Sequence, residues 1–156
     1  LWAMLYYIDT FPQKLHHPKE EAYLFRRVKM RTREADAAIL KLEEQHRAGV
    51  EHVKALEMSL GKYQAGAPGG REEFMAAAER FADEIAVHMA LEENVLIPIA
   101  KHHLLNEDWA EIARAFGENG DPRFGAEPDH EFRALFSRIV NLAPPPIGVG
   151  PSGTAA

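Results

Sequence analysis

Cysteine is absent from the 156-residue chain. Its absence excludes disulfide bonds, metal sites built from thiolates and a cysteine nucleophile. A chain without cysteine also fits a reducing compartment, so we expect a cytoplasmic protein.

An excess of positive charge is also missing. The chain has 18 Lys and Arg against 24 Asp and Glu, a formal net charge of −6. Nucleic-acid-binding proteins usually present a basic face to the phosphate backbone, so we expect no nucleic-acid partner. No apolar run approaches the roughly 20 residues of a membrane-spanning helix, and the N-terminal LWAMLYYI lacks the features of a signal peptide. We therefore expect no membrane association.

Signals for β-strands are nearly absent, whereas the helix-forming residues Ala, Leu, Glu, Lys and Arg are abundant. We predict one all-α domain over residues 1–142, an up-down helical bundle, followed by a Pro/Gly-rich tail at 143–156. The chain begins at Leu1 inside an apolar helical pattern without a capping signal. We therefore expect further residues of the domain upstream.

Turn and cap signals divide the bundle into helices. We expect Pro12 and Pro18 to kink or break the first helix. Thr32 is a predicted N-cap of the second helix, and AGAPGG at 65–70 is a predicted loop before the third. The segments expected to be helical are about 1–30, 33–64, 71–103, a stretch capped by Asn106, and 130–142, with GENGDPRFGAEPD as a loop before the last.

Two of the long helices carry polar residues within an otherwise apolar stripe. The stripes follow steps of three and four residues, the spacing that keeps side chains on one face. They are Ile39, Leu42, His46, Gly49, Val53, Leu56 and Leu60 in the second helix, and Phe74, Ala78, Phe81, Ile85, His88, Glu92, Val95 and Ile99 in the third. His46, His88 and Glu92 are therefore predicted to face the core, where an unpaired carboxylate is unfavourable.

The first helix carries a similar group in HHPKEEAYLF. His16, His17 and Glu20 lie at roughly 0°, 100° and 40° around a helix axis, so all three can face a common centre. Pro18 disturbs the ideal geometry and leaves two pairs open, His16 with Glu20 or His17 with Glu21.

These polar groups are predicted to lie at one level of the bundle. His16 lies 16 residues before residue 32 and His46 lies 14 after it, while His46 lies 22 residues before residue 68 and His88 lies 20 after it. In antiparallel neighbours each mismatch of two residues is about 3 Å. Three helices should therefore bring His and Glu together in the core.

Imidazole and carboxylate ligands without thiolates favour iron, with manganese and zinc less favoured. Five or six donors exceed the needs of one tetrahedral ion, so we predict two metal ions. The alternative is an all-α interaction module in which neutral core histidines bond to the glutamates without metal. His52 lies about 240° around the helix from His46 and is expected to point elsewhere.

The chain resembles the hemerythrin-like, or HHE cation-binding, family through three motifs, HHPKEEAYLF, LEEQH and HMALEENVLIP. The resemblance implies a four-helix bundle with a non-haem di-iron centre that binds or senses dioxygen or a related small oxidant, or handles iron. Its ligand would be a small diatomic or peroxide, and an enzyme acting on peroxide or nitric oxide is the catalytic alternative. Ferritin-type sites use Glu-x-x-His, the opposite order.

By this resemblance the family's ligand positions fall on His16 and Glu20, on His46, and on His88 with Glu92, while His17 fits an additional ligand position. The family pattern begins with an earlier helix that carries another histidine ligand. We expect that helix upstream of Leu1.

Overall fold

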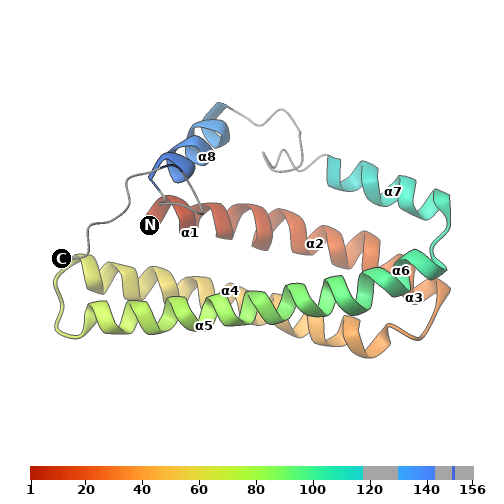
Figure 1. The fold of residues 1–156 in the computed structure, drawn as a ribbon, viewed down its shortest axis with the longest axis horizontal. Helices are drawn as coiled ribbons and strands as arrows, with labels where there is room; N and C mark the ends of the chain where they lie inside the picture. The colour runs from red at the N-terminus through yellow and green to blue at the C-terminus, as the bar shows by residue number, and fades with distance from the viewer. Residues whose placement is uncertain (118–129, 143–148, 150–156) are drawn as a thin grey trace.

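The protein is described from a computed structural model that covers residues 1–117, 130–142 and 149. All regular elements in these residues are helical, as predicted, and none of these helices is long and apolar enough to cross a membrane. Three long helical rods lie along one another, each antiparallel to the rod before it in the chain, and two shorter helices lie along one side of them (Figure 1).

The first rod is one continuous run of helical turns. It comprises α1 (Trp2–Ile8), η1 (Asp9–His16), α2 (His17–Lys19), η2 (Glu20–Phe25) and α3 (Arg26–Arg31), where η denotes wide π-helical turns. Pro12 lies within η1, and Pro18 lies within α2, between η1 and η2. Of the predicted kink or break at each proline, the break does not occur, because wider turns accommodate the missing backbone N–H groups and the helix continues.

The second rod is α4 (Asp36–Gln64), which begins later than predicted. Thr32 is extended, and its hydroxyl accepts the N–H of Glu34 at 3.2 Å, so it closes a short turn and is not the N-cap of α4. The predicted loop before the third helix is present, and Gly66 and Gly69 adopt positive φ values of 68° and 72° there. Glycine is favoured at both positions because other side chains resist that conformation.

The third rod comprises α5 (Gly70–Leu91), η3 (Glu92–Leu96) and α6 (Ile97–His103). The predicted apolar stripe is correct as far as Glu92 and wrong at Val95. Val95 is 39% exposed, whereas Leu96 and Ala100 are 0% exposed, and Ile99 is partly buried against the core. The π-helical turn inserts one extra residue, so the centre of the buried face moves to Leu96 and Ala100.

Two shorter helices follow, α7 (Asn106–Gly117) and α8 (His130–Leu142). The predicted cap Asn106 is the first residue of α7. The backbone N–H of Leu105 instead donates to Asp108 Oδ2 at 3.0 Å, so Asp108 supplies the cap from the first turn. The predicted loop at 118–129 and, apart from Val149, the predicted tail lie outside the described residues.

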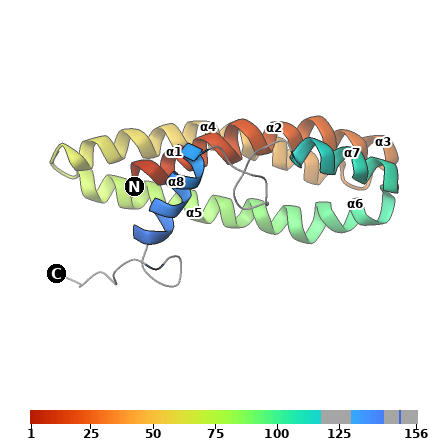
Figure 2. The ribbon, with the colours of Figure 1, turned by 90° about the horizontal axis from the view of Figure 1, so that it is seen from above.

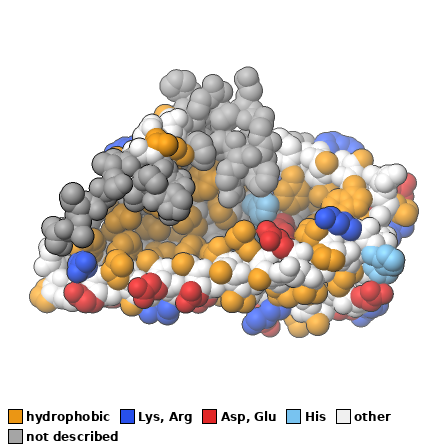
Figure 3. Space-filling model, viewed as in Figure 1, with side chains coloured by type: hydrophobic (Ala, Val, Ile, Leu, Met, Phe, Trp, Pro, Cys, Tyr) orange, Lys and Arg blue, Asp and Glu red, His pale blue; other side chains and the backbone are white. Residues whose placement is uncertain are grey.

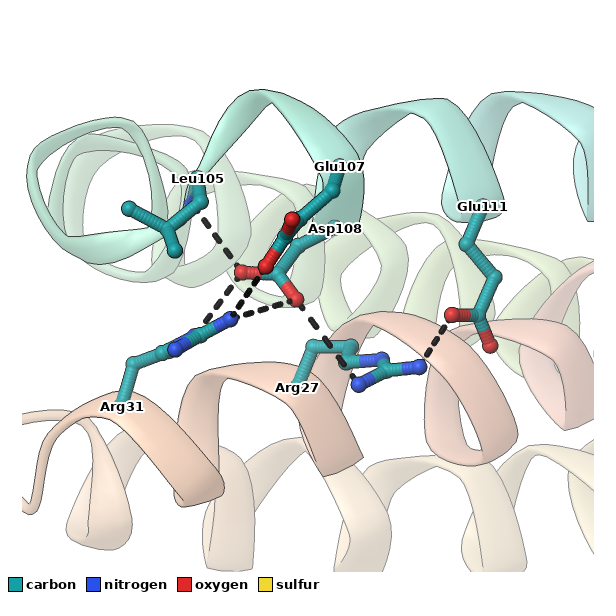
Figure 4. A network of polar contacts seen from close by, with 6 residues as sticks. All are labelled: Arg27, Arg31, Leu105, Glu107, Asp108 and Glu111. Atoms are coloured by element: carbon teal, nitrogen blue, oxygen red, sulfur yellow. Dashed lines mark hydrogen bonds and ion pairs between the residues drawn. The ribbon is translucent and has the colours of Figure 1, made fainter.

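An ion-pair network attaches α7 to α3 (Figure 4). Asp108 is 2% exposed, and its carboxylate accepts from Arg31 at 2.9 and 3.2 Å. Arg27 lies 3.8 Å from the same carboxylate and also donates to Glu111. The buried Asp108 is thus held by cations from the first rod, which fixes α7 above it.

Two apolar clusters fill the space between the rods. One cluster lies toward α6 and α7, with Phe25, Ile39, Leu42 and Leu96 among its members. The other lies toward the opposite end of the bundle: Leu5, Leu56, Leu60, Phe74 and Ala77. His17, Glu20, His46 and His88 lie between the residues of these two clusters along each rod. Figures 1 and 2 show the rods from the side and from above.

The surface between the rods is strongly apolar on one face. Figure 3 shows hydrophobic side chains along the groove on this side, with acidic and basic side chains mainly along its edges. The large exposed hydrophobic side chains near the start of the first rod are Leu1, Trp2, Met4 and Tyr6.

Candidate metal centre

Four buried side chains from three rods meet at one point in the bundle. They are His17 and Glu20 from the first rod, His46 from α4 and His88 from α5, and one ligand atom of each lies within 4.8 Å of those of the others. The exposed fractions of the four residues range from 1% to 8%. The structure therefore brings these four side chains together at the level of the bundle that the chain positions predict.

The three imidazole rings form a compact group. His17 stacks on His46 with ring centroids 4.1 Å apart, and the centroid of His88 lies 5.1 Å from that of His46 and 5.4 Å from that of His17. Phe25 stacks on the ring of His46 at 5.6 Å. The rings are thus held by one another and by the adjoining apolar cluster.

Glu20 lies at the centre of the group, and its two carboxylate oxygens face different histidines. Its Oε1 lies 3.1 Å from His16 Nε2, and its Oε2 lies 3.3 Å from His46 Nε2. The sequence left open whether His16 pairs with Glu20 or His17 with Glu21. The structure brings both histidines to Glu20, because π-helical turns on either side of α2 change the angular spacing of an ordinary helix.

Glu92 completes the set of predicted residues. Its Oε2 lies 4.0 Å from His88 Nε2, and its carboxyl group shares a hydrogen bond with that of Glu20. Burial and the neighbouring Glu20 carboxylate raise the pKa of Glu92 to about 8. Two acids that lie this close in the core cannot both stay ionised unless a cation compensates them.

The remaining pKa shifts report the same environment. Burial, together with His46, lowers the pKa of His17 to about 3 and also lowers that of His88. Burial would lower the pKa of His46 as well, but the carboxylates of Glu20 and Glu21 outweigh it and raise it. Burial would likewise raise the pKa of Glu20, but hydrogen bonds, the first of them from His16, hold it well below its usual range.

Two residues outside the cluster orient imidazoles, in roles that the sequence did not indicate. His46 Nδ1 donates to Glu21 Oε1 at 2.8 Å, and His88 Nδ1 donates to Gln45 Oε1 at 3.1 Å. Each bond leaves the Nε2 lone pair directed toward the cluster. Glu21, which the sequence offers only as a possible partner of His17, has a side chain that is 43% exposed, and its carboxylate reaches His46. No spacing signal marks Gln45, which precedes His46 in the chain.

Helix α7 covers the side of the cluster on which His16 lies. The Phe116 ring meets His16 edge-on, with centroids 5.2 Å apart. Lys19 Nζ donates to the carbonyl of Ala115 at 2.6 Å and holds the end of the helix in place. The C-terminal part of the chain thus shields a group that the three rods alone leave open.

The donor set fits a metal cation. Glu20 Oε2, His46 Nε2 and His17 Nδ1 are buried and have no hydrogen-bond partner. Unpartnered buried nitrogen and oxygen lone pairs are unfavourable, and a cation satisfies several of them at once. Neutral imidazoles and carboxylates are the ligands that iron, manganese and zinc accept.

The other candidate side chains lie away from this centre. His52 is directed elsewhere, as predicted, and pairs with Glu84 at 2.5 Å. His103 pairs with Glu34 at 3.3 Å. Within the described part of the chain, His17, Glu20, His46 and His88 are the group with the spacing of a metal site.

Comparison with known proteins gives one match. The family model described as the hemerythrin HHE cation binding domain matches residues 3–100, which contain all six predicted site residues. No curated protein and no solved structure matches the chain.

Proposed function

This chain belongs to the hemerythrin HHE cation-binding family, and from that premise we propose that its buried His/Glu cluster holds two non-haem iron ions. The observation that supports this proposal best is the position of Glu20, whose two oxygens face different histidines. A carboxylate in that position is suited to bridge two ions.

The residues divide into two groups around Glu20. His46 lies at Oε2 with the rings of His17 and His88 beside it, and these three would hold one ion, with Glu21 and Gln45 fixing the tautomers of two of them. His16 lies at Oε1 and would hold the second ion. Glu92 shares a hydrogen bond with Glu20 and lies 4.0 Å from His88 Nε2, so it would serve as a further ligand beside Glu20. Six donors shared in this way leave coordination positions open for an external ligand.

The proposed function is the binding or sensing of dioxygen or a related small oxidant. Bound ferrous iron would supply the electrons for reversible oxidation by such a ligand. The chain contributes apolar cover on two sides, because Phe25 stacks on His46 and Phe116 meets His16 edge-on. Excluding water from a site strengthens its electrostatic interactions and limits side reactions.

Metal analysis tests the proposal. We expect about two irons per chain after anaerobic reconstitution with ferrous iron, and about one fewer in Glu92→Gln. The matched control is Glu93→Gln, which changes the exposed neighbouring residue and should leave the iron content unchanged. A wild-type protein that takes up no iron would support the alternative, a metal-free structural cluster.

Stopped-flow mixing then separates a carrier or sensor from an enzyme. Reduced, iron-loaded protein is mixed with dioxygen and, separately, with peroxide or nitric oxide. A spectrum that changes and reverses when dioxygen is removed supports binding. Continuous consumption of peroxide or nitric oxide with multiple turnovers would instead indicate the catalytic alternative.

A further inference from the structure

A cavity of about 330 Å³ lies between the first rod, α4 and α5, directly beside the histidine cluster. His17 and His88 form its inner wall, and both also belong to the candidate metal centre. The remaining wall includes Gln13 and Gly49 together with apolar side chains of α4 and α5. A molecule in the cavity would therefore contact the same imidazoles that surround the cluster.

The cavity is much larger than a diatomic ligand requires. A water molecule, similar in size to dioxygen, takes up about 30 Å³ in the liquid, and a cavity of about 150 Å³ is enough to bind benzene. At about twice the latter volume, this cavity has room for a small organic molecule. Its size also reaches the lower end of the range found for ligand pockets.

The lining favours an uncharged occupant. Ala48, Phe81 and Ile85 give it apolar walls. Three of the titratable side chains that line it are paired: His52 with Glu84 at 2.5 Å, and Lys41 with Glu44 at 3.3 Å.

Both signs of charge are disfavoured in the cavity. Transfer of a charged ligand from water to these apolar walls is unfavourable for either sign of charge. The acidic Asp83, which also lines the cavity, further repels an anion.

One polar group in the wall has no partner. Gln13 is 8% exposed, and neither its Oε1 nor its Nε2 has a hydrogen-bond partner. Gly49 makes room for this amide, since a Cβ added to Gly49 would lie 2.8 Å from Gln13 Nε2. A buried amide without partners requires an explanation, and a ligand with one donor and one acceptor group provides it once the amide turns toward the cavity.

We propose that this cavity binds a small, uncharged, mainly apolar organic molecule that carries an amide-like hydrogen-bonding group. The molecule lies between Ile85 and Gln13, with its inner end against His17 and His88. Contact between this molecule and a metal ion rests on the function proposed above. The cavity itself does not depend on a bound metal ion.

The test uses three probes of nearly the same shape and different charge: benzamide, benzoate and benzamidine. Binding to the metal-free full chain is followed by NMR through the ¹³C-labelled methyl group of Ile85, assigned by its loss in Ile85→Val. We expect a saturating shift with benzamide and a dissociation constant on the order of 1 mM, typical of so small a ligand. Benzoate and benzamidine should bind at least about 10-fold more weakly.

A pair of glycine variants on α4 provides the matched control. Gly49→Ala would displace the Gln13 amide from its present place and fill part of the cavity that Gly49 lines, and we expect it to weaken benzamide binding at least about 10-fold. Gly61→Ala makes the same change where nothing lies within 4 Å, so binding should stay as in the wild type. Ala48→Leu, which narrows the cavity from the same helix, should also weaken binding and serves if Gly49→Ala does not fold.

Three results would overturn the inference: no saturating Ile85 shift up to about 20 mM benzamide, equal affinity for the three probes, or wild-type affinity in folded cavity-narrowing variants. Iron content is measured separately on the same preparations. Iron uptake without benzamide binding would reject the inference and leave the proposed function intact. Benzamide binding without iron uptake would reject the proposed function and leave the organic-ligand site in place.

Discussion

At the scale of single residues, the centre depends on bonds that lie one step outside the cluster. Glu21 accepts the Nδ1 proton of His46, and Gln45 accepts that of His88. Such partners fix the tautomer and orientation of an imidazole and raise its basicity. A residue that never touches a metal can therefore control how tightly the metal is held.

The first prediction concerns Glu21. Glu21→Ala should weaken ferrous iron binding about 10- to 100-fold without changing the number of ions bound, because His46 loses the acceptor that orients it. Competition with a fluorescent chelator measures the change. Glu51→Ala, which removes an exposed carboxylate from α4, is the control. An affinity loss no larger than that of the control would show that Glu21 does not position His46.

The sequence predicted which residues converge but only part of how they do so. His46 and His88 could be placed because each interrupts an apolar stripe and their distances from the turns agree. The outer partners could not be predicted, because neither Glu21 nor Gln45 lies on the buried stripe. Their roles depend on where the imidazole of a neighbouring helix lies, and only the three-dimensional structure gives that position.

At the scale of elements, the π-helical turns determine which side chains face inward. Glu20 begins η2 and Glu92 begins η3, so both carboxylates lie where the helix widens. Turns of this kind are frequent at functional sites. A straight-helix pattern could not predict them, and for that reason the expected burial of Val95 was wrong.

The second prediction follows from the inserted residue in η3. Leu96→Ala should lower the free energy of unfolding by about 2–5 kcal/mol, since Leu96 is fully buried. Val95→Ala should change it by no more than about 0.5 kcal/mol because Val95 is exposed. Urea unfolding of the metal-free variants gives both values. A larger loss for Val95→Ala would mean that the helix continues without the wide turn.

The third prediction concerns the attachment of α7. The bond from Arg31, with that from the N–H of Leu105, holds the pKa of Asp108 below its usual value of 3.8. A lowered pKa in the folded state means that the ionised form stabilises the fold above about pH 4. That stability is lost as the pH falls through the folded-state pKa. Asp108→Asn should therefore be less stable than the wild type at pH 7, and the difference should shrink below about pH 4.

Unfolding of the metal-free proteins between pH 7 and pH 3 measures this effect. Glu107→Gln is the control, because the Glu107 side chain is 75% exposed and lies 3.4 Å from Arg31. A stability difference for Asp108→Asn that does not change with pH would contradict the assigned role of the Asp108 carboxylate.

At the scale of the whole molecule, a polar cluster divides the core into two apolar parts. The metal-free cluster has buried lone pairs without partners, so it is a weak point between two well-packed regions. The bundle and the level of the cluster were predictable from chain distances. The covering role of α7 was not, because no metal motif occurs after residue 104 and Phe116 contacts His16 only through the fold.

The fourth prediction is that metal binding stabilises the entire fold. A ligand that binds only the folded state at 100 times its dissociation constant adds about 2.7 kcal/mol. Ferrous iron should therefore raise the thermal midpoint of unfolding under anaerobic conditions, and a chelator should reverse the rise. Glu20→Gln should lose most of the increase, because the carboxylate between the two groups of ligands is gone. An equal rise in Glu20→Gln would indicate that iron binds elsewhere.

The most direct test of the central claim is anomalous X-ray diffraction at the iron edge on crystals of the reconstituted protein. The account predicts two iron peaks about 3.5–4 Å apart, the separation usual for paired metal sites. One peak should lie near His17, His46 and His88 and the other near His16, with Glu20 between them. Iron peaks outside this cluster, or none, would contradict the account.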